Sequence, residues 1–95
     1  MRLSSQKIQF IKNGLKNQAP ESEVYIFGSR ADDHAKGGDI DILWLTKEKI
    51  PQQNTRKFKV EFYKKFGWQK IDIVNFTFNQ EDIFKDIALS QAEEL

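Results

Sequence analysis

The sequence predicts one α/β domain in which short strands alternate with helices along the chain. Two observations carry this prediction. Three runs are rich in β-branched and aromatic residues and are bounded by glycine or polar residues. Apolar residues at helical spacing precede the first run, separate the last two and follow the third. With 95 residues, the chain has room for a single domain, 1–95, around one modest core.

The first helix is expected to begin at Ser4, whose hydroxyl can cap the N–H groups of the first turn. Ile8, Ile11 and Leu15 then form one apolar stripe. Pro20 ends the helix, because proline disfavours helical backbone both at its own position and at the residue before it.

Three segments have strand character, namely 24–27, 39–45 and 71–76. The first is wholly apolar and stops at a glycine. The second alternates at its start and then becomes apolar, as expected for a strand that begins at a wet edge and ends in the core. Residues 29–38 are small, charged and glycine-terminated, so we expect a short helix or turn followed by a loop there.

A long helix is expected between the second and third strands. Phe58, Phe62 and Phe66 recur at intervals of four residues, and Gly67 suits the end of the helix. Residues 51–55 are polar and show no pattern, so we expect them to form a connector.

The last helix is expected to follow the third strand, with Asn79 as its N-cap and Asp82 near its positive end. Its buried side is expected to comprise Ile83, Phe84, Ile87, Ala88 and Leu95. The complete order is then α-β-(short α)-β-α-β-α, with three strands flanked by helices.

Composition excludes several classes of function. Fifteen basic and fourteen acidic residues leave a net charge of +1, which indicates neither an acidic tail nor a nucleic-acid coat. The absence of cysteine excludes disulfides, thiolate metal ligands and thiol catalysis. The longest apolar runs have four residues, whereas a membrane-spanning helix needs about twenty. We therefore expect a soluble, cytoplasmic protein.

Two carboxylates stand at the start of the second strand. Strand alternation places Asp39 and Asp41 on one face, about 6.7 Å apart along the strand. At an effective dielectric of 20 their charges repel by roughly 2.5 kcal/mol, so in a cleft they favour a cation between them. Hard oxygen ligands of this kind suit Mg²⁺ or Mn²⁺. A solvated strand edge is the plainer alternative.

A third carboxylate, Asp72, joins this pair only under one topology. If the second and third strands are parallel neighbours, all three carboxylates meet at one end of the sheet. Gly28 and Ser29 follow the first strand, and they reach the same end only if that strand is antiparallel to the second. The site therefore requires a mixed sheet. Asp72 also fits a simpler reading, as the polar position of an alternating strand.

The Gly28-Ser29 step has the properties of a phosphate site. Glycine allows a ligand to approach the backbone closely. Ser29 would open a short helix whose N–H groups and hydroxyl favour an anion. Arg30 and Lys36 could neutralise further phosphate charge. His34, the single histidine, is read as a surface residue.

These residues together resemble the nucleotidyltransferase superfamily that includes DNA polymerase β. The match consists of Gly28-Ser29, a D-x-D pair after nine further residues, and a carboxylate on a later strand. Among its members, the chain looks like the minimal nucleotidyltransferases, the MNT proteins, over nearly its whole length. Many relatives read G-S-R-A-R-G, whereas this chain has two aspartates after Gly-Ser-Arg-Ala.

The resemblance implies a site and a reaction. It assigns Gly28 and Ser29, with Arg30 and Gly38, to nucleotide binding, and Asp39, Asp41 and Asp72 to catalysis and to Mg²⁺ or Mn²⁺. ATP or another NTP would be attacked at its α-phosphate, and pyrophosphate would leave. Asp72 would help to bind the catalytic metal and act as, or orient, the base for the attacking hydroxyl.

The resemblance also implies a partner. MNT proteins are commonly paired as antitoxins with a separate HEPN-domain toxin and can transfer AMP to its tyrosine. We therefore expect a HEPN-type partner and an acceptor on another chain, in a homo- or hetero-oligomer. The alternative is a non-catalytic nucleotide-binding subunit that neutralises its partner by stoichiometric binding.

Two charged segments leave a further alternative open. Residues 56–70 hold six basic residues and one acidic residue, and residues 81–95 hold five acidic residues and one basic residue. The basic segment is read as a solvated helix face, with RNA, a nucleotide tail or an acidic partner as alternatives. We do not expect a membrane or nucleic acid as the main partner.

Overall fold

The computed structural model describes residues 4–27 and 39–95. The short helix expected within 29–38 lies outside the described residues. The elements follow one another as α1 (Ser5–Gln18), β1 (Glu23–Phe27), β2 (Ile40–Thr46), α2 (Gln52–Phe66), β3 (Ile71–Thr77), α3 (Ile83–Gln91) and β4 (Glu93–Glu94).

The strands form one mixed sheet in the order β3-β2-β1-β4. β1 runs antiparallel to β2, and β3 runs parallel to β2, which confirms the topology that the carboxylates require. The expected number of strands was wrong, because Glu93 and Glu94 add a fourth at the edge of β1. This segment has no strand pattern of its own; it pairs because β1 presents backbone groups at that edge, and Leu95 N–H donates to Val24 C=O at 2.9 Å.

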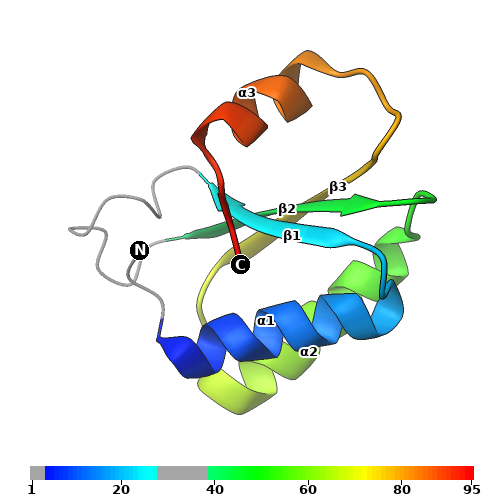
Figure 1. The fold of residues 1–95 in the computed structure, drawn as a ribbon. Coiled ribbons are helices and arrows are strands. Elements are labelled where there is room, and N and C mark those ends of the chain that lie inside the picture. Colours follow the sequence, from blue (N-terminus) through cyan, green and yellow to red (C-terminus); the bar gives the residue numbers. More distant parts are fainter. Residues whose placement is uncertain (1–3, 28–38) are drawn as a thin grey trace.

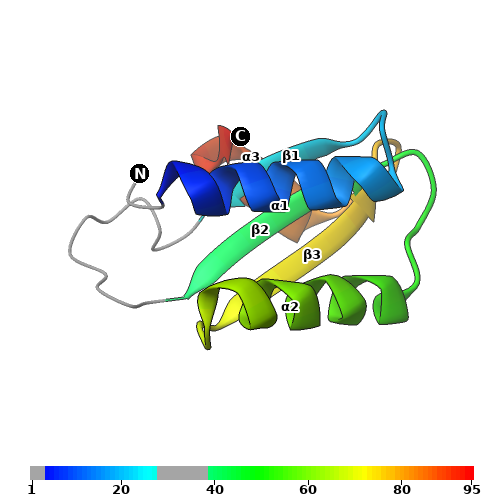
Figure 2. The same cartoon turned by 90° about the horizontal axis from the view of Figure 1, so that it is seen from below.

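Helices cover both faces of the sheet. α1 and α2 lie side by side on one face, and α3 lies on the other (Figure 1, Figure 2). The larger core cluster fills the space under α1 and α2 and includes Ile11, Leu15, Ile42, Trp44 and Phe62, each fully buried. A smaller cluster under α3 comprises Leu43, Leu45, Phe76 and Ala88. Alternate residues of β2 thus serve the two cores.

α1 begins and packs as the sequence predicts. The Ser4 side chain accepts a 3.2 Å hydrogen bond from Lys7 N–H, and Ile11 and Leu15 are its buried residues. Gly14 faces α2, where a Cβ would come within 2.5 Å of the Phe58 ring. Glycine at this position lets the two helices approach closely.

α2 starts earlier than expected. The predicted connector over 51–55 was wrong, because the helix begins at Gln52 with Pro51 as its N-cap. The residues of the first turn are polar and exposed or half-buried, so no apolar pattern marks this part of the helix. The predicted Phe58 and Phe62 are buried, and Gly67, at φ 84°, ends the helix.

α3 differs from its prediction in start and orientation. Its N-cap is Asp82 rather than Asn79; the Asp82 carboxylate accepts from Phe84 N–H at 2.8 Å and Lys85 N–H at 3.3 Å. Its buried residues are Lys85 and Ala88, of which Ala88 was expected and Lys85 was not.

None of the other residues expected on the buried side of α3 is fully buried there. Ile83 and Ile87 are 79% and 54% exposed, and Leu95 follows the helix and packs against the larger core cluster. Phe84 is half-exposed, but its ring packs against those of Phe27 and Phe76 on the sheet. The Lys85 ammonium explains the orientation. It donates to the C=O groups of Thr77 at 3.1 Å, Phe78 at 2.8 Å and Gln80 at 2.9 Å, which holds that side of α3 against the turn after β3.

Among the described residues, none of the helices has the length and apolar character needed to cross a bilayer.

Candidate active site

Three carboxylates gather where β2 and β3 begin. Asp41 and Asp72 are register partners on these parallel neighbours. Asp39 directly precedes β2 and, two residues before Asp41, shares its face. Partner residues of adjacent strands project to the same side, so the sheet places all three on one face at one end.

That face is the one covered by α3. Ile40 and Ile42 contribute to the core under α1 and α2, so Asp41 between them projects to the opposite side. Further along the same side of β2, Leu43 packs in the core under α3. Asp39 and Asp72 are near the rim, with side chains 48% and 47% exposed. These two carboxylates are thus open to a ligand from solvent.

The end of β1 meets the same place. Phe27, its last residue, is the register partner of Asp41. Its ring also lies 5.9 Å from that of Phe84 in α3, centroid to centroid. Gly28 is joined to Phe27 by one peptide bond. Gly28, Ser29, Arg30 and Gly38, with Lys36, lie outside the described residues, and their assigned roles remain predictions.

One cation lies between two of the carboxylates. The Lys70 ammonium is 3.7 Å from Asp39 Oδ2 and 3.9 Å from Asp72 Oδ2. Its backbone is held in place, since Lys70 C=O accepts a 2.9 Å hydrogen bond from Ile40 N–H. Sequence reasoning missed this role and counted Lys70 only among the basic residues of 56–70. The signal that could have indicated this role was its position two residues before Asp72, directly before β3.

Two of the carboxylates offer ligands that suit a divalent cation. Asp39 and Asp72 both reach a single cation position, the one that the Lys70 ammonium shares, and carboxylate oxygens are the ligands Mg²⁺ and Mn²⁺ take. Within residues 4–27 and 39–95, no group of three His, Cys, Asp or Glu side chains lies close enough together to hold a metal ion. The Lys70 ammonium lies between two carboxylates, those of Asp39 and Asp72.

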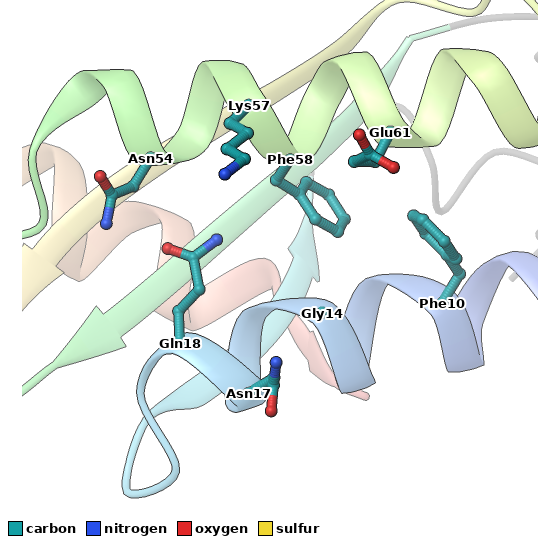
Figure 3. A pocket seen from close by; sticks show the side chains of 8 residues that line it. All are labelled: Phe10, Gly14, Asn17, Gln18, Asn54, Lys57, Phe58 and Glu61. Atoms are coloured by element: carbon teal, nitrogen blue, oxygen red, sulfur yellow. The ribbon is translucent and has the colours of Figure 1, made fainter.

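A groove lies elsewhere on the molecule. This groove of about 500 Å³ separates α1 and α2; Figure 3 shows Phe10, Gly14, Asn17 and Gln18 from one helix and Asn54, Lys57, Phe58 and Glu61 from the other. These helices cover the face opposite the carboxylates. The groove is therefore separate from the candidate active site.

Comparison with known proteins gives a family match over most of the chain. The profile of a family described as "Polymerase beta, Nucleotidyltransferase" matches residues 9–95. No curated protein matches the chain by sequence.

Several solved structures share the fold. A toxin–antitoxin complex with AMP-PNP matches with a TM-score of 0.72 at 20% identity, over 97% of this chain and 72% of that one. A mutant MntA–HpeT toxin–antitoxin complex matches at 0.68 and 21%, over 98% and 71%. A complex of tri-AMPylated Shewanella oneidensis HEPN toxin with MNT antitoxin matches at 0.70 and 16%, over 97% and 71%. At these identities the likeness is one of fold.

Proposed function

Because this chain belongs to the polymerase β nucleotidyltransferase family, we propose that it transfers a nucleoside monophosphate, AMP from ATP, to a partner protein. The observation that carries this proposal is the register of Phe27, Asp41 and Asp72. It places the end of β1, which Gly28 follows in the sequence, beside the two aspartates. In cells, the chain would act as the antitoxin of a HEPN-type toxin in the cytoplasm.

The proposed reaction is an in-line displacement at the α-phosphate of ATP. The acceptor hydroxyl forms a new P–O bond, the bond to pyrophosphate breaks, and Asp72 takes the hydroxyl proton. Asp39, Asp41 and Asp72 would hold Mg²⁺ or Mn²⁺, which neutralises charge on the triphosphate and the leaving group when bound. The protein contributes mainly position and electrostatics.

The nucleotide would lie across the ends of β1 and β2. Gly28 and Ser29, with Arg30 and Gly38, are proposed to hold the triphosphate, because Gly28 is bonded to Phe27, the register partner of Asp41. A triphosphate at this position would meet the carboxylates at the rim of the face that α3 covers. The matched structure that contains AMP-PNP supports a nucleotide as ligand of this fold.

The acceptor is proposed to be a tyrosine on a HEPN-domain chain. Two observations support a partner of this kind. One matched structure holds an AMPylated HEPN toxin with an MNT antitoxin, and two others are toxin–antitoxin complexes. Transfer to a separate chain also fits carboxylates that stand at an open rim.

The proposal is tested by incubating the chain with a co-purified HEPN partner, ATP and Mg²⁺, and measuring the intact mass of the partner. We expect a mass increase of one or more AMP units. The double variant Asp39→Asn plus Asp41→Asn should abolish it, whereas Asp86→Asn, an exposed carboxylate on α3, should not. An AMP adduct that forms equally well with the double variant would contradict the site.

A second candidate function is neutralisation of the toxin by binding alone. The observation that favours it is the exposure of Ile83 and Ile87 on α3, which are 79% and 54% exposed apolar side chains. The test measures how well each variant relieves the growth inhibition that the toxin causes. Equal relief by wild type and by the Asp39/Asp41 double variant would support this function over catalysis.

A further inference from the structure

The Lys70 ammonium lies between two of the carboxylates that the proposed function assigns to the metal. It lies 3.7 Å from Asp39 and 3.9 Å from Asp72, the two carboxylates that converge on one cation position. The hydrogen bond from Ile40 N–H to Lys70 C=O holds the Lys70 backbone next to the start of β2. Its side chain is 58% exposed and flexible, so the ammonium can leave without unfolding the sheet.

The charges explain why a cation resides there. Asp39, Asp41 and Asp72 stand on one face at one end of the sheet, where like charges repel one another. A lysine ammonium is a compact point charge that offsets this repulsion. It also repels a divalent cation that approaches the same oxygens. Metal binding therefore requires the ammonium to move away.

We propose that Lys70 is a resident counter-ion that competes with the divalent cation for Asp39 and Asp72, and that it pairs with nucleotide phosphate once displaced. The inference rests on the proposed function, since it assumes that metal and nucleotide bind at this edge. The consequence is that binding of the metal and binding of the nucleotide are coupled. The metal binds weakly alone and more tightly with nucleotide, because the triphosphate gives the displaced ammonium a new partner.

The first test measures Mn²⁺ affinity without nucleotide, from the electron paramagnetic resonance signal of the unbound ion. Lys70→Met should bind Mn²⁺ about tenfold more tightly than wild type, as expected from the loss of two exposed ion pairs that oppose binding. Lys70→Arg keeps the charge and should stay close to wild type. Lys64→Met is the matched control, since Lys64 makes an exposed pair of similar length, 3.9 Å, with Glu61.

The second test repeats the titration with a non-hydrolysable ATP analogue. The analogue should increase the Mn²⁺ affinity of wild type by a larger factor than that of Lys70→Met. This difference separates a counter-ion that moves to phosphate from a lysine that only weakens the metal site.

Two results would overturn the proposal, and they differ in what else they affect. If Lys70→Met and Lys64→Met bind Mn²⁺ as wild type does, Lys70 is not a competitor, while the metal site itself stands. If neither wild type nor Lys70→Met binds Mn²⁺ with or without nucleotide, the metal site of the proposed function fails, and the inference fails with it. Circular dichroism of each variant confirms that the fold is intact.

Discussion

Asp41 of β2 and Asp72 of β3 face each other across two parallel strands, although 30 residues of chain separate them. Asp41 is also the partner of Phe27 in β1, so a single row of the sheet joins all three strands at this end. Pairs of carboxylates at such short range repel unless a cation lies nearby. This row is therefore the centre of the candidate site.

The first prediction concerns Asp72. We expect Asp72→Asn to lower the rate of AMP transfer by at least about 100-fold, the lower end of what a general base contributes. ATP binding, measured by calorimetry, should weaken much less, because Asp39 and Asp41 remain. A variant that transfers AMP at the wild-type rate would show that Asp72 is only the polar position of an alternating strand.

The second prediction concerns the contact between α1 and α2. A methyl group at Gly14 would lie 2.5 Å from Phe58 Cε1. Alanine favours a helix over glycine by about 1 kcal/mol, but overpacking costs about 1–3 kcal/mol. We expect Gly14→Ala to lower the free energy of unfolding by about 1 kcal/mol in urea titrations.

The matched experiment uses a smaller neighbour. In a Phe58→Leu background the clash is relieved, so Gly14→Ala should stabilise the protein relative to that background. An increase in stability from Gly14→Ala alone would contradict the close packing of the two helices.

The third prediction compares the two possible caps of α3. The Asp82 carboxylate accepts hydrogen bonds from Phe84 N–H and Lys85 N–H, and Asn79 makes no such cap. We expect Asp82→Ala to lower the free energy of unfolding by about 1 kcal/mol. Asn79→Ala should change it by less than about 0.5 kcal/mol, as an exposed substitution does. Equal effects of the two variants would contradict the position at which the helix begins.

The fourth prediction concerns pH. The 2.7 Å hydrogen bond from the Tyr25 hydroxyl to Glu23, followed by burial and the charges of Glu23 and Glu94, raises the pKa of Tyr25 to about 12. The folded protein holds this proton more tightly than the unfolded chain does. The resulting stabilisation is therefore complete below pH 10 and is lost as the pH rises through about 12.

Absorbance of the ionised phenol against pH checks this prediction. Tyr25→Phe should remove the transition near pH 12. Glu23→Gln should move it to lower pH, because the carboxylate is the main cause of the shift. A transition that Glu23→Gln leaves in place would show that burial, rather than the hydrogen bond, dominates.

Helices with a local pattern could be predicted well from the sequence. The Ser4 cap, the Phe58 and Phe62 stripe and the stop at Gly67 each depend on residues within a few positions of one another. The start of α2 was missed because its first turn consists of polar residues that are exposed or half-buried and carry no apolar pattern. Residues close together in the chain therefore predicted which helices exist better than where each helix begins.

Other features depend on contacts between distant segments. The orientation of α3 follows from Lys85, an exposed residue by type that is buried here because three carbonyl groups accept its hydrogen bonds. The fourth strand follows from the open edge of β1 rather than from the residues Glu93 and Glu94 themselves. Neither can be read from spacing along the chain.

Residue types and spacing along the chain were enough to select the carboxylates that could form a site and the topology that would bring them together. The folded sheet was needed to show that Asp41 faces Asp72, that both stand beside the end of β1, and that the Lys70 ammonium lies between Asp39 and Asp72. Strand register depends on backbone hydrogen bonds and core packing over the whole sheet. Those interactions join residues far apart in the chain, which no local pattern records.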